Sequence, residues 1–230
     1  MIFQERIDLS RLTFLSDKGC PAFDGVEITG PELLERLQSY TSNRHQSEGW
    51  PVWKSRPINH YLSPLLASQT LDHCSFCDGY PLHGGMTPCT VEHFRPKSGS
   101  LAHEELRFEW VNLFACCSDC QRCKGSKWHE DLLKPDDIDY KFEKYFDCDF
   151  ETGRILPSER AAEGDKLRAA KTIEIYNLNR GAHIRLRYYE KHPIFSPDLP
   201  LDEKSYRYWI SALEEAAQQK HRKPSEILSS

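Results

Sequence analysis

The sequence predicts a mixed α+β fold in which helices surround one small cysteine-rich module. Apolar residues recur at helical spacing in several segments outside positions 74–130. In contrast, seven of the nine cysteines fall within the 50 residues from Cys74 to Cys123. A chain of 230 residues is long enough to bury a core without disulfide bonds. We therefore expect three regions, at 1–73, 74–130 and 131–230, packed into one compact domain.

The N-terminal region is expected to be helical. Residues 29–31 (Thr-Gly-Pro) are typical of a helix start, and the apolar residues that follow have the spacing of one helix face: Leu33, Leu34, Leu37 and Tyr40. Polar residues and prolines predict a loop over 41–58. Ser63 and Pro64 then predict the N-cap and the first residue of a second, short helix.

The C-terminal region is expected to contain a hairpin and three helices. Two short apolar runs at 146–150 and 155–156 flank Gly153 and indicate a β-hairpin. Helical spacing from residue 165 onward is broken near Asn177, and a second, basic helix follows. A last amphipathic helix carries apolar residues at helical spacing: Tyr206, Ile210, Leu213 and Ala217.

Charge is unevenly distributed along the chain. The formal net charge is −5, with ten acidic and five basic residues over 131–164 but seven basic and three acidic residues over 165–193. Net acidity argues against a protein that binds nucleic acid only through non-specific phosphate contacts, because such proteins gain affinity from each neutralised phosphate. We therefore expect a partner to supply part of any such binding. No run of 18 apolar residues is present and the first residues are charged, so we expect a cytoplasmic protein with reduced thiols and no membrane partner.

The cysteine spacing predicts a zinc site. Cys74 and Cys77 form one pair two residues apart, and Cys117 and Cys120 form another. Two such pairs complete a tetrahedral four-sulfur site, and a closed site of this kind stabilises structure rather than catalysing a reaction. The second pair is ambiguous, because the cysteines near it also allow other choices: Cys116, Cys117, Cys120 and Cys123.

The insert between the two pairs carries residues suited to acid–base chemistry. His93 can accept a proton near neutral pH, and the neighbouring Glu92 offers the oxygen ligands that Mg²⁺ prefers. Adjacent side chains on a strand point to opposite faces, so both can serve one site only if the chain turns at this point. Asn112 lies later in the insert, and Gln121 follows the fourth cysteine of the proposed site.

These elements together resemble a known family. An acidic-His pair followed by Pro96, then Asn112-Leu113, then a Cys-x-x-Cys segment with a lysine, is similar to the HNH endonucleases, whose ββα-metal site consists of two strands and a helix. More narrowly, residues 92–98, 110–113, 171–174 and 177–179 are similar to the PtuB-type HNH proteins of Septu and retron-associated anti-phage systems. The HNH motif covers residues 74–128.

The resemblance implies a metal-dependent endonuclease that hydrolyses phosphodiester bonds, with an α+β fold of helices around a small zinc-stabilised ββα-metal module. In it His93 is the general base, Asn112 positions the loop that presents His93, and Glu92 with Gln121 binds catalytic Mg²⁺ or Mn²⁺. Gln121 stands where the family has Asn or His, and His103 or His129 are the alternatives for this ligand. The basic residues near the motif are candidate phosphate contacts: Arg95, Lys97, Lys124 and Lys127.

The same resemblance implies partners. It indicates an anti-phage effector that acts with an ABC-type ATPase of the PtuA kind, and with a retron reverse transcriptase and its non-coding RNA in some systems. The substrate is DNA or RNA, since the chemistry acts on phosphate. Two alternatives remain: a catalytically weak, zinc-stabilised nucleic-acid-binding module, and a structural scaffold subunit of an ATPase complex.

Overall fold

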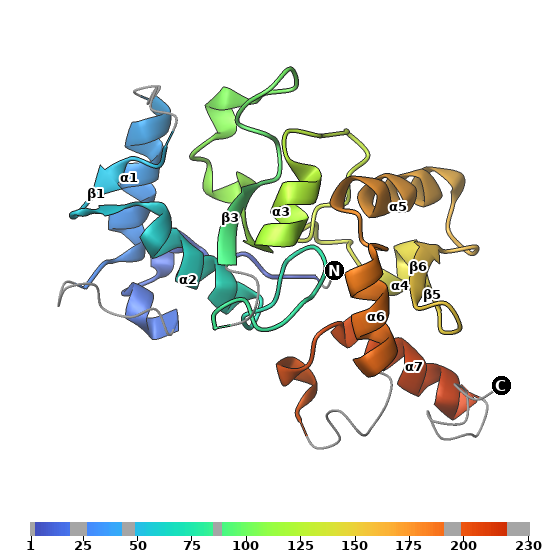
Figure 1. Cartoon of the computed structure of the whole chain (residues 1–230). Helices are drawn as coiled ribbons and strands as arrows, with labels where there is room; N and C mark the ends of the chain where they lie inside the picture. The colour runs from blue at the N-terminus through green and yellow to red at the C-terminus, as the bar shows by residue number, and fades with distance from the viewer. Residues whose placement is uncertain (1–2, 19–26, 43–48, 85–88, 191–198, 220–230) are drawn as a thin grey trace.

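The computed structural model describes residues 3–18, 27–42, 49–84, 89–190 and 199–219. Within them the chain forms helices and three two-stranded antiparallel sheets, which confirms the predicted α+β class. In Figure 1 helices α1 and α2 lie at one end of the molecule, β3 and α3 in the middle, and α5, α6 and α7 at the other end. The buried core extends from Leu9 to Trp209 and draws on all three sequence regions.

The first helix begins where the sequence predicts. Helix α1 spans Gly30–Ser42, and Thr29 forms a reciprocal cap with Glu32. The Thr29 hydroxyl accepts from the Glu32 amide, while the Glu32 carboxylate accepts from the Thr29 amide. In the segment predicted as a loop, the described part contains a short ribbon, in which β1 (Val52–Trp53) pairs with β2 (Arg56–Pro57).

The prediction for the second helix was wrong at its start. Helix α2 spans Asn59–Gln69, so Pro64 lies inside the helix rather than at its first position. The first turn forms because Tyr61 and Leu62 are buried in the core. This apolar burial outweighs the loss of one backbone hydrogen bond at the proline.

The cysteine-rich module is a two-stranded sheet followed by a helix. Strand β3 (Cys89–His93) pairs antiparallel with β4 (Leu113–Cys117), in a register that sets Cys89 opposite Cys117 and His93 opposite Leu113. Helix α3 (Ser118–Lys124) follows β4 directly, and the Cys117 sulfur caps it by accepting from the Cys120 amide. The order of elements is therefore strand, strand, helix.

The C-terminal elements agree with their predictions. After α4 (Phe142–Tyr145), β5 (Phe146–Asp149) and β6 (Arg154–Pro157) form the hairpin, with Gly153 at a φ of 72° in the turn. Helix α5 (Glu163–Tyr176) ends at Asn177, which has a left-handed backbone conformation, and α6 spans Gly181–Glu190. Helix α7 (Arg207–Gln219) is the amphipathic helix. No helix in the described ranges has the length and apolar character needed to cross a bilayer.

A buried ion pair attaches α7 to the loop that carries the first cysteine pair. The guanidinium of Arg207, the first residue of α7, contacts the carboxylate of Asp78 at 2.7 Å, and the Arg207 amide also donates to Asp78. The Asp78 side chain is 2% exposed. Arg207 makes a second ion pair at 3.3 Å with Asp202, whose side chain is 63% exposed.

We expect these two ion pairs to contribute very differently to the free energy of unfolding. Asp78→Asn removes the buried carboxylate partner of Arg207 and leaves it only the exposed Asp202, so the free energy of unfolding should fall by about 3 kcal/mol. Asparagine is the suitable replacement because residue 78 has a φ of 60°, which Asn tolerates. Asp202→Asn, at the exposed partner of the same arginine, should cost less than about 1 kcal/mol. Urea unfolding of both variants measures the difference, and equal losses would contradict the assignment.

Candidate functional site

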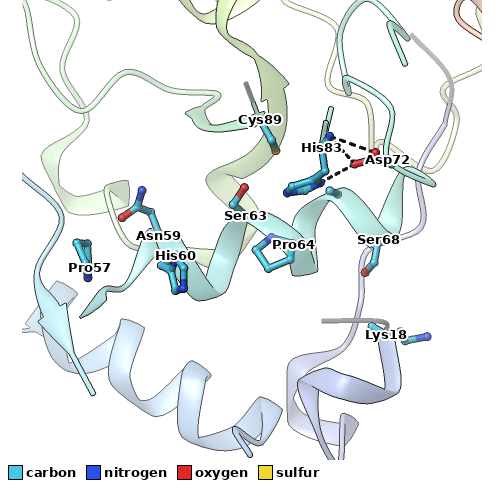
Figure 2. A pocket seen from close by; sticks show the side chains of 11 residues that line it. Lys18, Pro57, Asn59, His60, Ser63, Pro64, Ser68, Asp72, His83 and Cys89 are labelled. Atoms are coloured by element: carbon cyan, nitrogen blue, oxygen red, sulfur yellow. Dashed lines mark hydrogen bonds and ion pairs between the residues drawn. The ribbon is translucent and has the colours of Figure 1, made fainter. Parts of the chain in front are cut away.

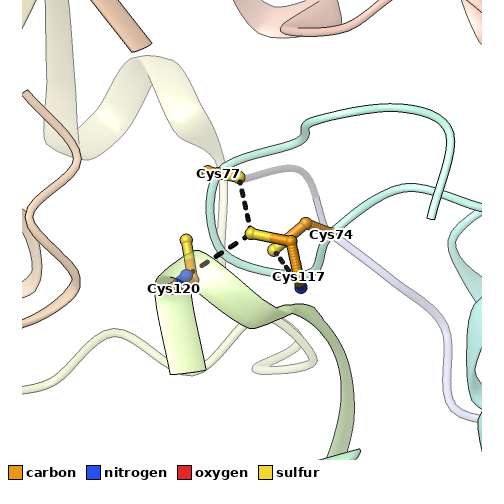
Figure 3. Close-up of side chains that lie close together, drawn as sticks. All are labelled: Cys74, Cys77, Cys117 and Cys120. Carbon is orange, nitrogen blue, oxygen red and sulfur yellow. Dashed lines mark hydrogen bonds between the residues drawn. The ribbon is translucent and has the colours of Figure 1, made fainter. Parts of the chain in front are cut away.

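Four buried cysteines meet where β4 passes into α3. The sulfur atoms of Cys74, Cys77, Cys117 and Cys120 all lie within 4.8 Å of one another. Figure 3 shows that Cys74 and Cys77 come from the loop before β3, whereas Cys117 ends β4 and Cys120 lies on α3. The structure therefore selects Cys117 and Cys120 as the second pair, and the half-buried Cys123 lies outside this cluster.

One sulfur–sulfur distance in the cluster matches that of a tetrahedral zinc site. Zinc–sulfur bonds of about 2.3 Å in a tetrahedron require neighbouring sulfurs to be about 3.8 Å apart. The Cys77 and Cys117 sulfurs are 3.8 Å apart. Four thiols of this geometry could hold a structural metal ion such as zinc, with no position open for substrate.

Hydrogen-bond donors surround these sulfurs. The backbone amide of Cys117 donates to the Cys74 sulfur at 3.4 Å. The Arg180 guanidinium lies 3.7 Å from the Cys120 sulfur and 4.0 Å from the Cys117 sulfur. Because thiolates are the metal-binding form, these donors favour metal binding and offset the negative charge of a four-thiolate site. Arg180 also ties the turn between α5 and α6 to the cluster.

His93, the candidate base, ends β3 and is almost completely buried. Its side chain is stacked against the indole of Trp50, with ring centroids 5.2 Å apart, and its Nε2 lies 3.0 Å from the backbone oxygen of Arg107. Burial, together with the nearby positive charge of Lys97, lowers the pKa of His93 to about 3. The imidazole is therefore neutral at pH 7.

Asn112 connects the turn after β3 to the segment before β4. Its amide oxygen accepts from the backbone amide of Arg95 at 2.8 Å, and its amide nitrogen donates to the carbonyls of Arg95 and Leu106 at 3.0 Å. The Asn112 carbonyl also accepts from the backbone amide of Phe94. These bonds fix the chain directly after His93.

Glu92 lies on the opposite face of β3 from His93, as expected for adjacent strand residues. Its carboxylate accepts a hydrogen bond of 2.7 Å from Lys124, the last residue of α3. Burial raises the pKa of Glu92 to about 7, although the Lys124 contact acts in the other direction. The structure thus does not bring the side chains of Glu92 and His93 together, because the chain does not turn between them.

Gln121, the other predicted Mg²⁺ ligand, is also engaged by a protein group. The amide nitrogen of Gln121 donates to the backbone oxygen of Val91 at 3.1 Å. With the Glu92 carboxylate engaged by an ammonium group and Gln121 bound to β3, these two residues do not form an open site for Mg²⁺ in this conformation. Of the two alternatives for this ligand, His103 pairs through Nδ1 with Glu105, and His129 pairs through Nδ1 with Asp131.

The four candidate phosphate contacts have different environments. Lys127 is exposed, and the exposed Arg95 lies with its guanidinium 4.9 Å from the Trp128 ring centroid. Lys97 is half-buried, with its ammonium 5.6 Å from the Trp50 ring centroid. Lys124 is 0% exposed. As folded, Lys124 does not reach a phosphate outside the protein, which corrects the sequence-based assignment.

Two contacts of His93 were not anticipated from the sequence. Trp50 precedes His93 by 43 positions, and nothing in its local sequence indicates that it covers the imidazole. The second contact is the Arg107 carbonyl, a backbone group that any residue type could supply. Residue patterns do not reveal either contact.

A separate cavity of about 770 Å³ lies beside α2. Figure 2 shows residues of α2 on one side of this cavity and the hydrogen-bonded Asp72 and His83 on another. The His83 Nδ1 is 2.6 Å from the Asp72 carboxylate. None of the sequence-predicted site residues lines the cavity, so it is distinct from the candidate site.

Comparison with known proteins does not assign the chain to a family. No protein-family model matches it, and no curated protein sequence is significantly similar to it.

The cysteine geometry predicts one zinc ion per chain. Cys120→Ser should lose the ion, because a neutral hydroxyl replaces one of four thiolates. Cys123→Ser is the matched control, since it changes a neighbouring α3 cysteine outside the cluster. Elemental analysis of purified protein measures both. Equal zinc content in the two variants, or well below one zinc per wild-type chain, would contradict the site.

The low pKa of His93 predicts a pH dependence of stability. The folded value of about 3 lies below the ordinary value of 6.5, so the unfolded chain binds more protons between these values and stability falls as the pH falls through that range. When the pH is lowered from 7.5 to 5.5, protonation of His93 in the unfolded chain should reduce the free energy of unfolding by about 1.4 kcal/mol.

Urea unfolding at the two pH values measures this cost. His93→Gln should lose less stability than wild type over this range by about that amount. His183, also lowered to a pKa of about 3 by burial, remains in both proteins and cancels in the comparison. An identical pH dependence in the two proteins would contradict the assignment.

Proposed function

We propose that this protein is an HNH-type endonuclease that hydrolyses phosphodiester bonds of nucleic acid. The observation that carries the proposal is the set of Asn112 hydrogen bonds, which hold the chain immediately after His93. This is the role that the HNH resemblance gives to its middle asparagine. The order of β3, β4 and α3, with a four-cysteine cluster at the junction of β4 and α3, is further support.

The hydrogen bonding of His93 leaves Nδ1 as the ring nitrogen that can accept a proton. A backbone carbonyl can only accept a hydrogen bond, so the contact with the Arg107 oxygen requires a proton on Nε2. In the neutral ring Nδ1 then carries the lone pair and is the atom that would take a proton from the attacking water. Trp50 stacks on the face of this ring and holds its orientation, whereas the Nδ1 lone pair lies in the ring plane.

The nucleic acid would be held by exposed cationic groups near the turn after His93. Arg95 and Lys127 are exposed, and Lys97 is half-buried with its ammonium close to the Trp50 ring. This small set, in a chain of net charge −5, supports a partner that supplies further binding surface. We propose an ABC-type ATPase of the PtuA kind as that partner, with the protein acting as an anti-phage effector in the cytoplasm. The support for this partner is the sequence resemblance.

One observation favours a second candidate function. His93 is 6% exposed and covered by Trp50, while Glu92 is already paired with Lys124. A chain that keeps the zinc-stabilised module but binds nucleic acid without cleaving it would have such a closed site. The same closure is compatible with a scaffold subunit of an ATPase complex.

A cleavage assay tests the proposal. Zinc-loaded protein, alone and with a candidate ATPase, is incubated with plasmid DNA and with total RNA in Mg²⁺, in Mn²⁺ and in EDTA. His93→Ala should lower the cleavage rate by at least about 100-fold, the usual contribution of a general base. His83→Ala, at an exposed histidine beside the separate cavity, should leave the rate unchanged.

The assay separates the candidates. Cleavage that persists in His93→Ala would exclude His93 as the base. Binding of nucleic acid without cleavage under every metal and partner condition would favour the binding module. Neither binding nor cleavage, with stable association with the ATPase, would favour the scaffold.

A further inference from the structure

A fully buried lysine supplies the positive charge on the α3 side of β3. Lys124 is a lysine with 0% exposure, and lysine is almost never fully buried unless its charge is paired. Its ammonium lies 2.7 Å from a carboxylate oxygen of Glu92 and 2.8 Å from the backbone oxygen of His93. Both distances are those of direct, charge-assisted hydrogen bonds.

These two oxygens are the kind that a hard divalent cation binds. Carboxylate and backbone carbonyl oxygens are typical ligands of Mg²⁺ and related ions. A divalent ion on the same Glu92 oxygen would lie next to the ammonium group, with strong repulsion in a site that water does not screen. The Lys97 ammonium adds positive potential near the same carboxylate.

We propose that the Lys124 ammonium is the resident cation of this site and excludes a divalent metal ion from Glu92. The inference concerns the same site as the proposed nuclease function and rests on that function only for the choice of site. It replaces the expectation that Glu92 and Gln121 bind Mg²⁺ or Mn²⁺ in the folded chain. Lys124 is thus a positioning residue, which fixes Glu92 against α3.

The Lys124 side chain is fully buried, and its ammonium is held by two oxygens of β3. Its residue follows Cys123 at the end of α3, and the Cys120 sulfur in the same helix belongs to the four-cysteine cluster. The helix is therefore anchored at both its first turn and its last residue. This anchoring makes the ammonium a fixed group rather than a mobile counter-ion.

The test measures Mn²⁺ binding to the full, zinc-loaded chain by electron paramagnetic resonance, without nucleic acid. Wild type should show no Mn²⁺ binding that depends on Glu92, so wild type and Glu92→Gln should bind alike. Lys124→Met keeps the unbranched apolar stem, one atom shorter, and removes the charge. It should create one site, at least tenfold tighter than any in wild type, that disappears in the double variant Lys124→Met, Glu92→Gln.

Lys171→Met is the matched control, because it removes the same charge from a half-buried position on α5, where Lys171 pairs with the exposed Glu174. It should behave as wild type does. Tight binding in wild type that is lost in Glu92→Gln would overturn the inference. So would a folded Lys124→Met variant that gains no site.

The comparison of wild type with Glu92→Gln decides the question even if Lys124→Met does not fold. Because no cleavage is measured, the result is independent of the proposed function. The Mn²⁺ measurement tests whether Glu92 binds metal, and the cleavage assay tests whether the protein is a nuclease. Either proposal can therefore fail without the other.

Discussion

The meeting of four thiols at the junction of β4 and α3 is the constraint on which the rest of the structure depends. It joins the loop before β3 to the end of β4 and the first turn of α3. The C-terminal helices attach to the same place, because Arg180 approaches two of the sulfurs and Arg207 pairs with Asp78, next to Cys77. A metal ion held there would supply folding free energy directly.

Burial governs the chemistry of the candidate site. Where water is excluded, a charge persists only with a partner, so Glu92 and Lys124 are in direct contact and His93 is neutral. Alternation along β3 sends Glu92 toward α3 and His93 toward Trp50. The two residues that the motif places side by side in sequence thus belong to two separate environments.

Most of the secondary structure could be predicted, because its signals are local. The start of α1 follows from the cap at Thr29, the hairpin from Gly153 and the break after α5 from Asn177. The start of α2 was misplaced because burial of Tyr61 and Leu62, a tertiary effect, outweighs the local preference of Pro64 for a first turn. Within the candidate site, Trp50 and the Arg107 carbonyl carry no local signal.

The sequence by itself determined the α+β class and the presence of cysteine pairs at the spacing of a zinc site, since both depend on short-range patterns. Only the tertiary structure decided which cysteines form the cluster and what surrounds the residues between the pairs. Lys124 shows why. In the sequence it is a basic residue near a motif, and such residues are usually exposed, whereas the packing of α3 on β3 buries its ammonium against Glu92. The sequence shows that residue 124 is a lysine, but its partner depends on how elements distant in the sequence pack together.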